Sequence, residues 1–121
     1  MAGLACGETS PLAWRFLAPA VDFFMTVSDE QAIAAMRTLA TGEAGDVPVL
    51  GGESGAAGLA ALRVLVDSPA LRAQAGLGSE SRVLLINTEG ATAPALYAQL
   101  TGRTAAAVRA AQTAWLSERS A

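Results

Sequence analysis

Residues 47–59 read VPVLGGESGAAGL, an apolar run that enters a glycine-rich turn and continues into a segment rich in alanine and leucine. This order predicts a strand over 47–50, a loop, and a helix from about 55 to 66. Units of this kind place ligands at the C-terminal end of the strand. Glu53 and Ser54 are the polar side chains at that end, and Gly55 permits close approach of a ligand or a neighbouring element.

The turn does not match a known phosphate-binding motif. No lysine follows the glycines, as a P-loop requires, and their spacing is not that of a dinucleotide-binding loop. The alternative, a glycine-rich turn that only joins a strand to a helix, therefore stays open.

A second strand is predicted over residues 82–87, which read RVLLIN and are followed by Thr88, Glu89 and Gly90. A continuous apolar run is typical of a parallel sheet covered on both faces. If the two strands are parallel neighbours, both loops lie at one sheet edge, where carboxylates bind amines or act as acid and base. The alternative is that Ser54 and Thr88 cap helices or turns, and that the two glutamates only favour helix N-termini.

Capping residues mark the other elements. Ser10 precedes Pro11 and Ser68 precedes Pro69, which is typical of helix starts, and Ser28 begins a capping box. We expect an α/β fold, a helix-rich fragment with two or three parallel strands flanked by about six helices. The third strand would be residues 25–27. Two or three strands do not form a stable sheet alone, so residues 1–121 are predicted to be a single incomplete domain. The predicted helices span about 11–24 (interrupted at Pro19), 29–42, 55–66, 69–76, 94–100 and 105–116.

The composition of the 121 residues excludes several functions. There is no histidine, and all eight basic residues are arginine, so this chain offers no histidine triad, no histidine metal site and no lysine Schiff base. Cys6 is the single cysteine, which leaves no internal disulfide, and no metal site is predicted. With a net charge of −3, no basic patch and no long apolar run, we expect neither a nucleic-acid partner nor a membrane partner. A cytoplasmic location is expected because no signal-peptide pattern is present.

Three stretches together resemble one enzyme family: MAGLACGE at 1–8, GGESGA at 51–56 and LLINTEG at 84–90. In this order they are similar to the C-terminal part of the diaminopropionate ammonia-lyases. These are pyridoxal-phosphate enzymes of the tryptophan synthase β-like class, which also contains the threonine dehydratases. The resemblance covers residues 1 to about 100 and implies that class's fold. It also implies elimination of ammonia from 2,3-diaminopropionate or a related amino acid, giving pyruvate.

The resemblance also implies site residues. The family usually has serine where Asn87 stands, so whether Asn87 or Thr88 meets the pyridine nitrogen stays open. The residues implied to bind the cofactor are Glu53, Ser54, Gly55, Asn87 and Thr88, and those implied to line the substrate pocket are Ala5, Cys6 and Gly7.

In this family the Schiff-base lysine, the catalytic carboxylate and the phosphate loop lie upstream of the matched segment. We therefore assign no catalytic residue to this chain, and pyridoxal 5'-phosphate is expected to bind only with the missing half. The expected partners are an amino-acid substrate and either the N-terminal half or a second copy in a homodimer. Whether the chain is itself an enzyme stays open. The alternative is a non-catalytic remnant, or a module that binds a partner through an open sheet edge.

Overall fold

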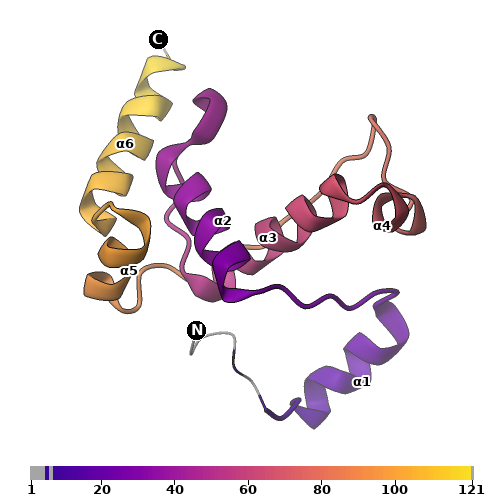
Figure 1. The fold of residues 1–121 in the computed structure, drawn as a ribbon. Helices are drawn as coiled ribbons and strands as arrows, with labels where there is room; N and C mark the ends of the chain where they lie inside the picture. Colours follow the sequence, from indigo (N-terminus) through magenta and orange to yellow (C-terminus); the bar gives the residue numbers. More distant parts are fainter. Residues whose placement is uncertain (1–4, 6, 121) are drawn as a thin grey trace.

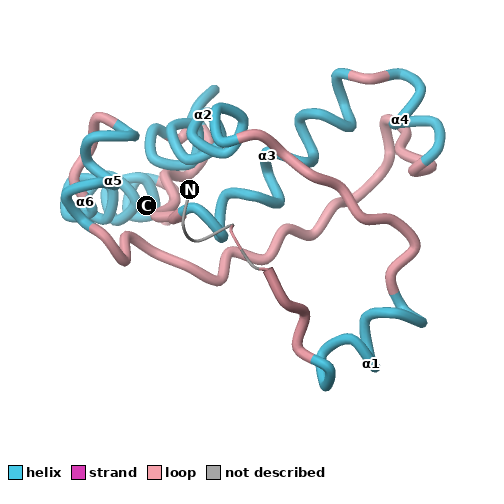
Figure 2. Tube along the Cα trace, turned by 60° about the horizontal axis from the view of Figure 1, so that its bottom comes forward, coloured by secondary structure: helices cyan, strands magenta, loops and turns pink. Residues whose placement is uncertain are grey.

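The structure, a computed structural model, describes residue 5 and residues 7–120. Helices α2, α3, α5 and α6 pack together, whereas α1 lies apart from them (Figure 1). Helix α4 follows the far end of α3, and an extended segment returns from there to α5 (Figure 2). The elements are α1 (Pro11–Ala20), α2 (Asp29–Thr41), the 3₁₀ turn η2 (Glu43–Gly45), α3 (Glu53–Asp67), α4 (Pro69–Gln74), α5 (Pro94–Thr101) and α6 (Ala105–Glu118).

The helix ends follow from local capping chemistry. At α2 the Ser28 hydroxyl accepts a hydrogen bond from the Gln31 N–H at 3.3 Å, and the Gln31 amide oxygen accepts one from the Ser28 N–H at 2.8 Å. These two bonds satisfy N–H groups that have no partner within the helix. Gly42 ends α2 in the left-handed conformation, with φ of 65°. The predicted capping box and helix end are therefore confirmed.

The first helix is shorter than predicted. The apolar pattern predicts a helix that reaches residue 24, but α1 ends at Ala20, one residue beyond Pro19. The last bond of the helix runs from the Val21 N–H to the Leu17 carbonyl at 2.9 Å. Pro19 lies inside α1, one residue before its end, so the helix is shorter than the apolar pattern predicts but is not split at Pro19.

The predicted parallel strands are absent from the residues that the structure describes, and the α/β prediction was wrong. Two strands pair only if the backbone N–H and C=O groups of both are available to each other. In residues 47–50, other groups hydrogen-bond to the backbone instead. The Val49 N–H donates to the Leu39 carbonyl at 2.7 Å, and the Leu50 carbonyl accepts from the Asn87 side chain at 3.0 Å. The segment 82–87 runs extended and exposed, with Leu84 84% exposed, and residues 25–27 also form no strand.

The core is built largely from small side chains. Helix α3 has an apolar sequence, but its buried positions are Gly55, Ala56 and Ala60, and its leucines are half-buried. Small residues allow two helix backbones to approach closely, and α3 packs chiefly on α2. The buried core cluster consists of Ala35, Met36, Ala40, Ala56, Ala60, Tyr97 and Val108.

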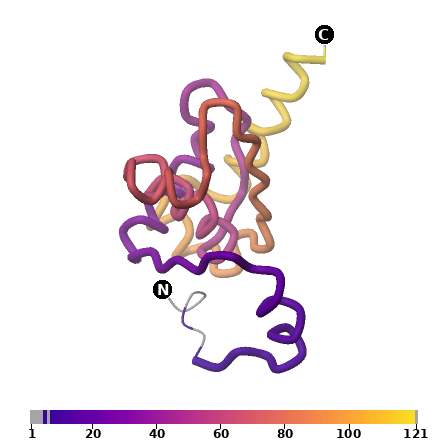
Figure 3. Tube along the Cα trace, turned by 90° about the vertical axis from the view of Figure 1, so that its right-hand side faces the viewer, coloured from indigo at the N-terminus to yellow at the C-terminus, as the bar shows by residue number. Residues whose placement is uncertain are grey.

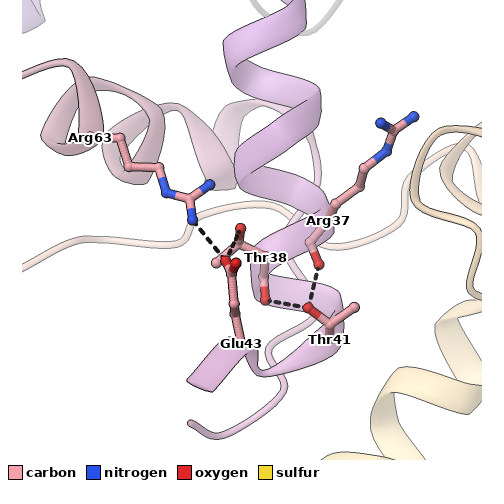
Figure 4. Close-up of polar contacts among 5 residues, drawn as sticks. All are labelled: Arg37, Thr38, Thr41, Glu43 and Arg63. Carbon is pink, nitrogen blue, oxygen red and sulfur yellow. Dashed lines mark hydrogen bonds and ion pairs between the residues drawn. The ribbon is translucent and has the colours of Figure 1, made fainter. Parts of the chain in front are cut away.

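Polar contacts join the helices at the end of α2. A Glu43 carboxylate oxygen accepts hydrogen bonds from the Arg63 guanidinium at 2.7 Å and from the Thr38 hydroxyl at 2.9 Å, which links α2 to α3 (Figure 4). Arg37 extends away from this contact, and its Nε donates to the Leu100 carbonyl of α5 at 2.7 Å. These bonds connect α2 with α3 and with α5.

Length and hydropathy together rule out a bilayer-spanning helix within residues 5 and 7–120.

Candidate functional site

The two glycine loops predicted as a site lie in contact, although no sheet joins them. The Gly52 N–H donates to the Glu89 carbonyl at 2.9 Å. The Asn87 amide donates to the Leu50 carbonyl at 3.0 Å, just before the first loop. The sequence placed these loops together only through two parallel strands, which do not form in the described residues. Hydrogen bonds between the loops themselves hold them instead.

Two glycines make this contact possible. A Cβ atom at Gly52 would collide with the Gly90 carbonyl oxygen. A Cβ atom at Gly55 would collide with the Asn87 side-chain oxygen and lie 2.8 Å from the Glu89 carbonyl oxygen. The φ angle of Gly52 is −79°, so the reason for glycine there is space and not backbone conformation.

The Glu89 side chain connects three segments. One carboxylate oxygen accepts from the Ser54 N–H at 2.8 Å, and the other accepts from the Thr92 hydroxyl at 2.8 Å. Ser54 lies in the first turn of α3, whose N-cap residue, Gly52, makes no side-chain cap. Glu89 therefore supplies the helix with a capping carboxylate from the other loop. The bond from the Ser54 N–H, followed by that from Thr92, lowers the pKa of Glu89, because both favour the charged form.

We predict that Glu89 contributes to stability above its ordinary pKa and that this contribution is lost in acid. Because the pKa of Glu89 is lowered in the folded state, the contribution disappears as the pH falls from about 5 through the folded-state pKa. Urea denaturation at a series of pH values should give a shallower acid decline for Glu89→Gln than for the unaltered chain. Glu80→Gln, on an exposed loop, is the matched control. Equal acid slopes for all three proteins would contradict the prediction.

A pocket of about 460 Å³ opens beside the two loops, between α2 and α5. Three carboxylates line it, those of Asp29, Glu53 and Glu89, and its described lining contains no basic side chain. This charge favours a small ammonium group and disfavours a phosphate. In the described part of the chain, no three His, Cys, Asp or Glu side chains are grouped so that they could hold a metal ion. The complete lining is Asp29, Ile33, Met36, Gly52, Glu53, Glu89, Gly90, Ala91, Thr92, Ala93, Leu96, Tyr97 and Leu100.

The predicted cofactor residues divide between the pocket and its surroundings. Glu53 lines the pocket, whereas Ser54 and Gly55 lie in the first turn of α3 outside the lining, and Asn87 and Thr88 precede Glu89. These five residues are brought together by the loop contact. Whether they bind a cofactor stays a prediction.

Two of the three predicted substrate-pocket residues, Ala5 and Gly7, are described by the structure, and neither lines the pocket beside the loops. Ala5 and Gly7 are exposed, and a Cβ atom at Gly7 would meet nothing within 4 Å. Cys6 lies outside the described residues, so its predicted role stays a prediction.

The sequence reasoning missed several residues of the pocket wall. Tyr97 is 2% exposed, lines the pocket, and has a buried hydroxyl without a hydrogen-bond partner among the described residues. Burial raises the pKa of this hydroxyl. Ile33 and Met36 of α2 also line the pocket and were not predicted as site residues. A signal for Tyr97 was present, because it is the single tyrosine of the chain and lies one turn beyond the second loop.

Comparison with known proteins identifies curated relatives. No protein-family model matches the chain, and no solved structure matches it significantly. The diaminopropionate ammonia-lyase of Escherichia coli (strain K12) is 39% identical over 95 residues, which is 76% of this chain and 24% of the relative. The diaminopropionate ammonia-lyase of Salmonella typhimurium (strain LT2) is 38% identical over 101 residues, 80% of this chain and 25% of the relative. The chain thus spans about a quarter of the length of these curated relatives. Over the matched residues, it is therefore a homologue of the diaminopropionate ammonia-lyases, as its three sequence stretches predicted.

Proposed function

We propose that this chain is the C-terminal part of a pyridoxal-phosphate ammonia-lyase that converts 2,3-diaminopropionate, or a related amino acid, to pyruvate and ammonia. The observation that carries the proposal is the direct contact between the two glycine loops, at which the resemblance assigns cofactor residues. The Gly52–Glu89 bond of 2.9 Å and the Ser54–Glu89 bond of 2.8 Å hold that wall in one arrangement.

The residues present fit one edge of the cofactor. Pyridoxal phosphate, when bound, supplies the electron sink for the elimination. Thr88 is exposed, and its hydroxyl has no hydrogen-bond partner among the described residues, so it is available to a ring nitrogen. Asn87 already donates to the Leu50 carbonyl and accepts from the Glu89 N–H at 3.4 Å, which favours Thr88 over Asn87. Nothing in the acidic pocket lining fits the phosphate, which agrees with a phosphate loop located elsewhere.

The acidic pocket supports an amine-bearing substrate. A diamino acid carries two amino groups, and the carboxylates of Glu53 and Glu89 lie in the wall beside the loops. The lowered pKa of Glu89 keeps that group charged and therefore attractive to an ammonium group. We assign Glu53 to cofactor or substrate contact and Glu89 to positioning of the α3 turn.

Catalysis requires a second polypeptide segment in this proposal. The chain has no lysine to hold the cofactor covalently, and it spans about a quarter of its relatives' length. The N-terminal part of such a lyase, or a homodimer that includes it, would supply the missing groups. The alternative module that binds through an open sheet edge lacks support, because the described residues form no sheet.

The proposal is tested by reconstitution. The chain is co-expressed with the part of the Escherichia coli enzyme that lies outside the matched segment, and pyruvate release from 2,3-diaminopropionate is measured. We expect turnover that Glu53→Ala lowers by at least about 100-fold and that Thr88→Val lowers by about 10-fold. Glu80→Ala is the control and should leave turnover unchanged. Absence of pyruvate with the unaltered pair would contradict the proposed activity, and full activity of Glu53→Ala would remove Glu53 from the site.

A further inference from the structure

An apolar arm, residues 11–25, extends from the helical core. In Figures 1, 2 and 3 its helix α1 lies apart from α2, α3, α5 and α6. No residue of α1 is buried, and Leu12 and Phe16 are 67% and 70% exposed. Phe24, beyond the helix, is also 67% exposed. Exposed apolar side chains concentrated on one short segment are typical of an interaction site.

The apolar arm has an internal structure that presents this surface. The Ser10 hydroxyl caps α1, and the rings of Trp14 and Phe24 lie with their centroids 5.9 Å apart, which ties the helix to the segment that follows it. Leu12 and Phe16 are four residues apart and therefore lie on one face of α1. The arm thus offers a preformed apolar face, which lowers the entropy cost of docking.

We infer that the apolar arm docks onto the polypeptide that corresponds to the three quarters of diaminopropionate ammonia-lyase outside the matched segment. This inference rests on the proposed function. The chain spans 24% of the Escherichia coli relative. In such an enzyme, most of the polypeptide around the matched segment would therefore come from the other three quarters. The arm carries only two charged residues, Arg15 and Asp22, so its complement is an apolar surface and not a charged one.

The test compares an arm variant with a matched variant elsewhere. The full chain is co-expressed with the affinity-tagged unmatched part of the Escherichia coli enzyme, and the complex is quantified by co-purification and by titration. The double variant Leu12→Gln, Phe16→Gln removes the apolar face and keeps good helix formers. Leu116→Gln makes the same kind of change at a 52% exposed position of α6. We expect the arm variant to weaken binding by about 100-fold and the control to change it by less than about 2-fold. Circular dichroism should show equal helix content in all three proteins, because the altered side chains are exposed.

The outcomes separate this inference from the proposed function. A complex that the arm variant leaves unweakened would overturn the inference alone. A complex that forms through the arm but yields no pyruvate would support the docking and contradict the proposed activity. No complex with the unaltered chain would contradict both. Self-association of the chain, measured by sedimentation and lost in the arm variant, would show that a second copy occupies the arm and would overturn the stated partner.

Discussion

Met36→Ala is expected to lower the free energy of unfolding of this chain by about 2–5 kcal/mol. Met36 is 1% exposed and is one of the two largest fully buried side chains in the described part of the protein. Its neighbours in the core are mostly alanines, which cannot rearrange to fill the space that a shortened side chain leaves. The cost therefore includes both the lost burial and an unfilled cavity next to the acidic pocket.

Urea denaturation followed by circular dichroism measures this loss. Met25→Ala is the matched control, since it makes the same chemical change at an exposed position and should alter stability by less than about 0.5 kcal/mol. Equal losses in the two variants would mean that Met36 is not part of a packed core.

Gly52→Ala is expected to separate the two glycine loops and to lower the free energy of unfolding by about 1–3 kcal/mol. The added methyl group would collide with the Gly90 carbonyl oxygen, which is backbone and cannot turn aside as a flexible side chain would. The Gly52–Glu89 hydrogen bond and the cap that Glu89 gives to α3 depend on the same close approach. In a reconstituted enzyme the variant should also lose turnover, because the wall carrying the predicted site residues is displaced.

Gly78→Ala is the control for this experiment. A Cβ atom at Gly78 would meet nothing within 4 Å, so alanine there should be neutral or stabilise the chain by up to about 1 kcal/mol. Amide hydrogen exchange of Ser54 reports the loop contact directly, and we expect faster exchange in Gly52→Ala only. Unchanged protection of Ser54 in that variant would show that the loops do not depend on this glycine.

Most helix starts were predictable because they depend on local capping chemistry. Ser28, Ser68 and Thr104 each begin a helix where predicted, since a cap bonds to an N–H only three residues away. The same was not true of the strands. A strand forms only if a distant segment offers its backbone groups in register. Here the Val49 N–H donates to the Leu39 carbonyl, and the Leu50 carbonyl accepts from the Asn87 side chain instead.

Part of the candidate site was also predictable, because some of its residues are recognisable from their local chemistry alone. The polar loop residues Glu53, Thr88 and Glu89 stand out in an apolar sequence, and their chemistry suggests a site without any knowledge of their neighbours. The role of Glu89 as a cap for α3 could not be predicted, because it acts across 35 residues of sequence. The pocket wall formed by Ile33 and Tyr97 likewise depends on how α2 and α5 pack.

The amino-acid sequence by itself therefore determined most helix starts, the pair of polar glycine loops, the absence of lysine and histidine chemistry, and the resemblance that its relatives confirm. Only the tertiary structure decided that the loops meet through Gly52, Gly55 and Glu89, that no sheet forms in the described residues, and that the apolar arm stands away from the core. The physical reason is distance along the chain. Caps and breakers act within about one helical turn, whereas a loop contact, a ladder or a packed face depends on partners that a local pattern does not specify.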